Sequence, residues 1–103
     1  MIQDLSQGDI IKIAGFQSLF MIVSKNAFIK ASHMFHVCPI LENIPDGPLH
    51  ISINGIKGTT GCVICEQIKL IDPSVRSCNR KDRVSYGSLI DISDALQGIF
   101  EYD

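Results

Sequence analysis

The chain has 103 residues, of which 46% are hydrophobic and 19% charged, and its formal net charge is -2. This length fits a single domain, residues 1–103, with a core large enough to form without disulfides. The small negative charge excludes a molecule-wide attraction to nucleic acid or anionic membrane, so a polyanion site requires a local cluster of cations. We find no signal peptide and no apolar stretch of about 18 residues, and therefore expect a cytoplasmic protein without membrane contact.

The first half of the chain predicts β-strands joined by turns. Residues 10–14, "IIKIA", alternate as a half-buried strand does, and residues 18–24, "SLFMIVS", form a continuous apolar run typical of a strand buried on both faces. Only residues 15–17 separate the two runs, which predicts a tight hairpin. Further strands are predicted at 33–41 and 49–53, on either side of the turn-rich loop "ENIPDGP".

The second half predicts more strands and a terminal helix. Residues 62–71 read as one long strand, and the polar, basic segment after it predicts short strands at 75–78 and near Val84. Apolar residues then recur at helical spacing, and Ser88 with Asp91 has the spacing of a capping box. Five to seven short strands and a C-terminal helix indicate a mainly β fold, either a small, bent antiparallel barrel or a two-sheet unit.

Cys62 and Cys65 form a Cys-x-x-Cys pair. A zinc site or a redox disulfide needs a turn that brings the two sulfurs together. Val63 and Ile64 favour an extended strand instead, on which positions three apart face opposite sides. We therefore interpret both cysteines as buried strand residues and expect no metal or cofactor; a site completed by other Cys and His residues is the alternative.

Glu66 is the candidate general acid or base. On an unbroken strand it shares the apolar face of Cys62, Ile64, Ile68 and Leu70. Burial there would raise the pKa of Glu66, as catalytic acids and bases require, unless a bulge turns it outward or a cation pairs with it. The alternative is a carboxylate at a strand bend in a structural ion pair.

Three histidines and a basic cluster are the other candidate functional residues. His50 lies on the polar face of its strand, whereas His36 is interpreted as a packed strand residue and His33 as a loop residue. Four cations fall within eight residues, namely Arg76, Arg80, Lys81 and Arg83. Phosphate contacts and a solvated loop are equally compatible with this cluster.

Several short motifs run in one order along nearly the whole chain: "GDII", "SLFMIVS" followed by "KNAF", "VCPI", "PLHISI" and "TTGCVICEQIKLIDPSVR". Together they resemble the MazF/PemK/Kid family of bacterial toxin ribonucleases, and the "EQ" followed by "IKLID" and an Arg is the most specific part. The resemblance implies a small SH3-like barrel of the CcdB/MazF type with a C-terminal α-helix. It also implies a homodimer whose interface groove takes up single-stranded RNA or the extended tail of a cognate antitoxin protein.

The same resemblance implies a growth inhibitor of a toxin-antitoxin system, a metal-independent endoribonuclease that helps a ribose 2′-hydroxyl attack the adjacent phosphate. We expect Glu66 to act as base or acid, Arg76 to contact the phosphate and His50 to act as the partner of Glu66. The expected RNA-binding residues are Gln17, Ser18, Arg80, Lys81 and Arg83.

Four departures from the family pattern bear on catalysis. Gln17 or Ser18 stands where the family carries an Arg, Leu41 where it carries Thr or Ser, and Ile64 where an Arg can precede the acid. The loop between the first two strands is reduced to "GFQ". A catalytically silent relative that binds RNA or protein is therefore the alternative function. A gyrase poison of the same fold is a third hypothesis, which the absence of Trp disfavours.

Overall fold

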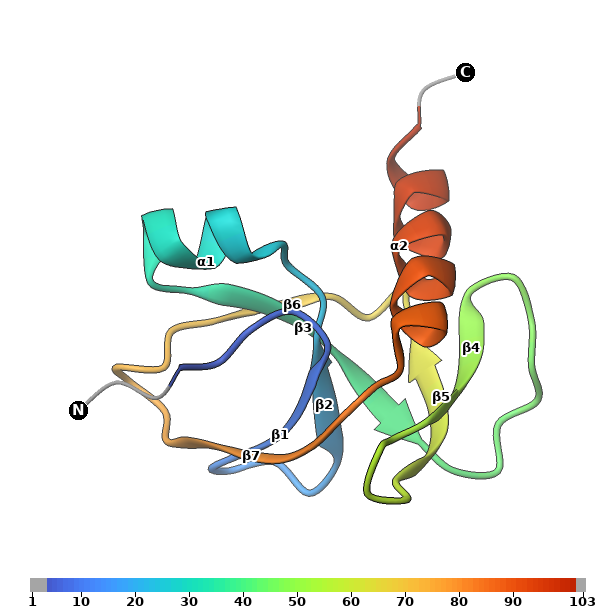
Figure 1. Ribbon diagram of the computed structural model, residues 1–103, viewed down its shortest axis with the longest axis horizontal. Coiled ribbons are helices and arrows are strands. Elements are labelled where there is room, and N and C mark those ends of the chain that lie inside the picture. Colours follow the sequence, from blue (N-terminus) through green and yellow to red (C-terminus); the bar gives the residue numbers. More distant parts are fainter. Residues whose placement is uncertain (1–3, 102–103) are drawn as a thin grey trace.

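The computed structural model describes residues 4–101, which form one antiparallel sheet and two helices (Figure 1). The elements follow in the order β1 (Asp9–Ile13), β2 (Leu19–Ile22), α1 (Asn26–Ser32), β3 (Phe35–Leu41), β4 (His50–Asn54), β5 (Thr60–Ile64), β6 (Lys69–Ile71), β7 (Cys78–Arg83) and α2 (Tyr86–Phe100). Helix α2 stands beside β4, whereas α1 lies next to β3 on the other side of the molecule.

The strands form a bent, open sheet in the order β4-β5-β3-β2-β1-β7, and β6 pairs with β3. Strands β4 and β7 are the edges of this path, and the bridge between Gly55 and Val84 links the residues that follow them. The predicted mainly β fold with a C-terminal helix is confirmed, although the seven strands do not close into a complete barrel over the described residues.

Alternation along the strands separates the apolar side chains into two cores, as the two faces of a pleated sheet require. One core lies between the sheet and α2 and includes Ile10, Met21, Cys38, Ile53, Val63 and, from the helix, Ile92. The other lies on the opposite face, within the bend of the sheet, and includes Ile11, Ile13, Phe20, Phe35, Val37 and Ile71.

The predicted long strand at 62–71 is wrong, because a turn interrupts it. Strand β5 ends at Ile64, whose carbonyl accepts a hydrogen bond from the Gln67 N–H at 3.1 Å, and β6 begins only at Lys69. The strand predicted at 75–78 is also displaced, since the backbone around Asp72 turns and β7 begins at Cys78.

Both helices differ from the sequence-based expectation. Helix α1 was not predicted. Its C-cap is His33, which has a left-handed backbone (φ 58°), so β3 begins at Phe35 and not at residue 33 as predicted. Helix α2 begins one turn before the predicted capping box, because the Ser85 side chain accepts the Ser88 N–H at 3.3 Å. Ser85, and not Ser88, is therefore the N-cap.

A buried carboxylate holds the β4–β5 hairpin against β7. Asp82 is 3% exposed and accepts backbone hydrogen bonds from Lys57 at 2.8 Å, Thr59 at 3.0 Å and Arg83 at 2.7 Å. A Cβ at Gly55 would lie 2.1 Å from an Asp82 oxygen, so only glycine fits there. Burial disfavours the charged form of Asp82, but the hydrogen bonds outweigh it and lower its pKa to about 2.

Replacing Asp82 with Asn should lower the free energy of unfolding by about 1–3 kcal/mol, because the amide nitrogen cannot accept and leaves a backbone donor unpaired. Since the folded-state pKa lies near 2, below the ordinary 3.8, the contribution of Asp82 is complete above about pH 4 and is lost as the pH falls toward 2. Urea denaturation across this range should show a weaker acid dependence in Asp82→Asn than in the natural protein. The exposed Asp91→Asn is the control, and equal acid dependence in Asp82→Asn and the natural protein would contradict the assignment.

Candidate active site

The turn that ends β5 places Glu66 beside His50 at the start of β4. The His50 Nε2 and Glu66 Oε2 atoms are 3.0 Å apart, and the two side chains are 33% and 45% exposed. Strand pairing explains the proximity, because His50 lies directly across from Ile64, two residues before Glu66. Two residues predicted separately as catalytic therefore form one solvent-accessible pair.

The rise in pKa expected for a buried Glu66 does not occur, because the stated exception applies and the carboxylate is turned outward. The turn at Cys65 and Glu66 directs the carboxylate to solvent, and the hydrogen bond with His50, followed by a backbone hydrogen bond, lowers its pKa. An ionised carboxylate can only accept, so His50 must donate its Nε2–H. The Nδ1 atom of a neutral His50 is then the ring nitrogen available as a base.

The four cysteines are buried and free. Burial raises the pKa of Cys38 to about 12, with the charges of Cys65 and Glu66 adding to it, and burial and Glu66 raise that of Cys65 to about 11. Cys62 lies elsewhere, with its Sγ 3.2 Å from the carbonyl oxygen of Ile44. Thiols with such raised pKa values are poor nucleophiles, and no cluster of three His, Cys, Asp or Glu residues within 4–101 could hold a metal ion.

A surface cavity of about 460 Å³ lies along the same hairpin, and its lining includes Leu41, Ser52 and Cys62. Ser52 is two residues after His50 on β4, so both side chains lie on one face of the sheet. A larger cavity of about 970 Å³ lies between α1 and the loop at 72–78, and its lining includes neither His50 nor Glu66. Neither cavity is lined by His50 or Glu66, and the smaller one is related to the pair only through Ser52, which shares strand β4 with His50.

The structure does not place Arg76 in contact with this pair. Its Nη1 donates to the carbonyl oxygen of Ala14 at 3.1 Å, and its guanidinium carbon lies 5.1 Å from the centre of the Phe16 ring. Gln17 and Ser18 follow in the same β1–β2 hairpin, with Gln17 exposed and Ser18 half-buried. Arg76, from the segment between β6 and β7, therefore contacts the hairpin that also carries Gln17 and Ser18.

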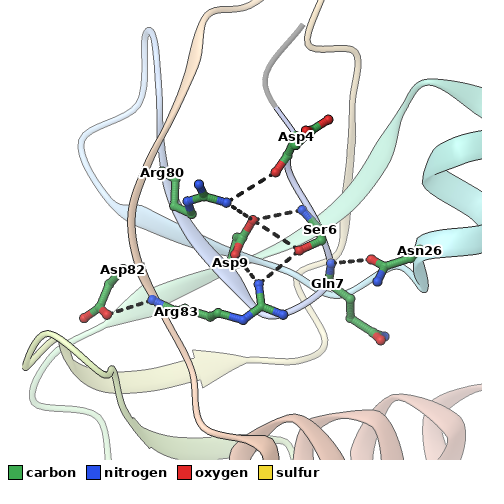
Figure 2. A network of polar contacts seen from close by, with 8 residues as sticks. All are labelled: Asp4, Ser6, Gln7, Asp9, Asn26, Arg80, Asp82 and Arg83. Carbon is green, nitrogen blue, oxygen red and sulfur yellow. Dashed lines mark hydrogen bonds and ion pairs between the residues drawn. The ribbon is translucent and has the colours of Figure 1, made fainter.

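Arg80 and Arg83 converge on the fully buried carboxylate of Asp9 (Figure 2). Arg83 Nη1 lies 2.5 Å from Asp9 Oδ1 and Arg80 Nη1 lies 3.3 Å from Oδ2. Ser6 donates its N–H to Asp9 Oδ2 at 2.9 Å and accepts from Arg83 at 3.0 Å. Much of the positive charge predicted for RNA is thus paired within the protein, and the sequence analysis did not single out Asp9.

A β-bulge at Lys81 explains this arrangement. Asp9 pairs with Arg83 and Ile11 pairs with Arg80, so the three residues 9–11 of β1 lie opposite the four residues 80–83 of β7 and the ladder shifts by one. Without the extra residue, Arg80 and Arg83 would face opposite sides. Lys81 is exposed and Asp82 points to the other side of β7 (Figure 2).

The remaining histidines lie apart from the pair. The His36 Nδ1 atom lies 2.8 Å from the Ser24 hydroxyl, and the same hydroxyl accepts the backbone N–H of His36 at 2.6 Å. The His36 ring packs against the Phe28 ring, with the ring centres 5.0 Å apart. His33 is exposed at the end of α1. These positions agree with the interpretation of His36 as a packed strand residue and His33 as a loop residue.

The fold is that of the MazF toxins. The structure of MazE–MazF (Form-II) from Deinococcus radiodurans matches with a TM-score of 0.80 and 14% identity, covering 96% of this chain and 97% of that one. An endoribonuclease from a mycobacterial species matches with a TM-score of 0.80 and 15% identity over 94% and 91% of the two chains. A mycobacterial endoribonuclease in complex with its cognate antitoxin matches at 0.77 and 15% over 96% and 99%. At these identities the similarity defines the fold alone.

The sequence profile described as PemK-like, MazF-like toxin of type II toxin-antitoxin system matches residues 7–100. The chain therefore belongs to this family, which confirms the resemblance drawn from its motifs. No curated protein sequence matches it. Within residues 4–101, neither helix has the length and apolarity needed to cross a bilayer.

Proposed function

We propose that this protein is a toxin of a type II toxin-antitoxin system that cleaves single-stranded RNA, with His50 and Glu66 as its acid–base pair. The observation that carries the proposal is the exposed hydrogen bond between these two side chains at 3.0 Å. A histidine held by an ionised carboxylate is an arrangement suited to general acid–base catalysis. Family membership supports RNA as the substrate.

The reaction needs no metal. His50 Nδ1 takes the proton of a ribose 2′-hydroxyl while Glu66 holds the Nε2–H, and the 2′-oxygen forms a bond to the adjacent phosphorus. The bond from phosphorus to the 5′-oxygen then breaks, and that oxygen takes a proton from the imidazolium. The products are a 2′,3′-cyclic phosphate and a 5′-hydroxyl. Gln17 or Ser18 stands where the family pattern has a cation, and Leu41 stands where it has a hydroxyl. Because both groups are missing from these positions, we expect slow cleavage.

The partners follow from the same family membership. We propose a cognate antitoxin with an extended tail and a homodimeric toxin in the cytoplasm. The MazF structure that contains MazE and the mycobacterial complex support an antitoxin partner. Leu70 and Phe100, which are 54% and 73% exposed, support further burial of apolar surface in a dimer.

Two observations favour a second function. Leu41 and Ile64 carry no polar side chain, and Arg80 and Arg83 are paired with Asp9 instead of being free for phosphate. A protein that binds RNA or peptide without cutting RNA fits these features.

The test is incubation of the purified protein with mixed single-stranded RNA, followed by analysis of the fragment ends. The proposal expects 2′,3′-cyclic phosphate and 5′-hydroxyl termini in the presence of EDTA, since no metal takes part. RNA that stays intact while remaining bound would reject the ribonuclease and favour the silent binding protein.

A further inference from the structure

The β1–β2 hairpin holds the guanidinium of Arg76 over an aromatic ring. The Arg76 Cζ lies 5.1 Å from the centre of the Phe16 ring, and Nη1 donates a hydrogen bond to the Ala14 carbonyl oxygen at 3.1 Å. Gly15 makes room for this contact, because its φ is +93° and a Cβ there would lie 2.7 Å from Nη1. The planar cation is thus fixed by three consecutive residues of the hairpin.

The ring beneath the guanidinium is also anchored. Phe16 packs edge to face on Phe20 with ring centres 5.3 Å apart, and Phe20 is 2% exposed within the core in the bend of the sheet. Arg76 itself is exposed. The guanidinium therefore lies over the Phe16 ring while the Arg76 side chain stays accessible to solvent.

Strand register places this stack on the same face of the sheet as the acid–base pair. Phe20 pairs with Pro39, and the pairing of Ile40 with Val63 sets Pro39 opposite Ile64, which pairs with His50. These four side chains form one row across β2, β3, β5 and β4. With strands about 4.8 Å apart, the row is about 15 Å long. Arg76 lies over Phe16 at the Phe20 end of this row and His50 is at the other end, so we assign the two residues to different nucleotides of one extended RNA strand.

We propose that Arg76, backed by Phe16, is a stacking site for an unpaired nucleobase of single-stranded RNA, at least one nucleotide away from the scissile phosphate. This rests on the proposed function for the identity of the ligand. Unstacked bases pack on guanidinium planes as they do on aromatic rings, and the positive charge adds attraction to the nearby phosphates. Arg76 then serves substrate binding, and the shortened hairpin "GFQ" contacts RNA through this plane.

The test measures binding of a fluorescent 2′-O-methyl oligoribonucleotide, which lacks the attacking hydroxyl and cannot be cut. Stacking of one base is worth about 1–3 kcal/mol, equivalent to about a 5- to 150-fold change in Kd. Arg76→Lys keeps the charge and removes the plane, and should weaken binding nearly as much as Arg76→Ala. Lys57→Ala removes an exposed cation on the β4–β5 hairpin and is the control for charge alone.

Oligonucleotides with one base removed at successive positions provide the second measurement. The natural protein should lose affinity at one position, and Arg76→Lys should be insensitive to base removal at that position, as a double-mutant cycle for a direct contact requires. Thermal unfolding of each variant checks that it is folded. Arg76→Lys binding as tightly as the natural protein would show a charge contact and overturn the stacking site, as would failure of the natural protein to bind. Binding that depends on Arg76 without any cleavage would retain the stacking site and reject only the ribonuclease.

Discussion

Replacing both Arg80 and Arg83 with methionine should lower the free energy of unfolding by about 3–5 kcal/mol, because it leaves the buried charge of Asp9 without a cation. The carboxylate is 0% exposed, whereas the arginine side chains are 52% and 46% exposed, so the cost comes from Asp9 and not from the arginines. Ser6 alone would remain as its hydrogen-bond donor. Urea denaturation of the double variant measures the loss.

Lys81→Met is the matched control, since Lys81 lies between the two arginines on β7 and is exposed. It should change the free energy of unfolding by less than about 0.5 kcal/mol. Adding Asp9→Asn to the double variant should recover part of the loss, because it removes the uncompensated charge. A double variant as stable as the natural protein, with RNA binding strongly weakened, would show instead that the arginines serve RNA as the sequence analysis expected.

Elements with a strong local pattern could be predicted from the sequence. The strands at 10–14 and 49–53 and the C-terminal helix each have an apolar face that a core must cover, and all three were found within a few residues of their predicted positions. Helix α1 was missed for the corresponding reason. It has seven residues and none of them is buried, so its sequence carries little helical periodicity.

The turn after β5 and the bulge in β7 could not be read from local alternation. The turn at Glu66 separates two runs that both contain β-branched residues, 62–65 and 68–71, so strand propensity on either side does not reveal it. The bulge at Lys81 brings two arginines to one buried carboxylate on a neighbouring strand, an arrangement in which the partners are more than 70 residues apart in the chain. Each feature puts a polar side chain on a side of the sheet other than the one that strict alternation assigns to it. Both therefore determine which candidate site residues come into contact.

For the acid–base pair, His50→Gln and Glu66→Gln should each lower kcat for RNA cleavage by about 10²- to 10⁴-fold, the usual contribution of a general acid–base group. His50 exchanges the proton directly, whereas Glu66 acts through it, so His50→Gln should have the larger effect. Because the two residues act as a unit, the double variant should be no slower than His50→Gln alone. Initial rates of fragment formation at saturating RNA measure this.

The pKa of Glu66 provides a readout that does not depend on cleavage. The hydrogen bond with His50 is the largest cause that lowers this pKa. His50→Ala removes the donor and should raise the Glu66 pKa toward its ordinary value, as measured by carboxyl NMR titration. His33→Asn removes an exposed histidine in a backbone conformation that Asn tolerates, and should leave both kcat and this pKa unchanged. If His50→Ala shifts the pKa but leaves cleavage intact, the pair is structural and another base serves the reaction. If neither changes, His50 and Glu66 do not interact in solution, and the pairing that carries the proposed mechanism is wrong.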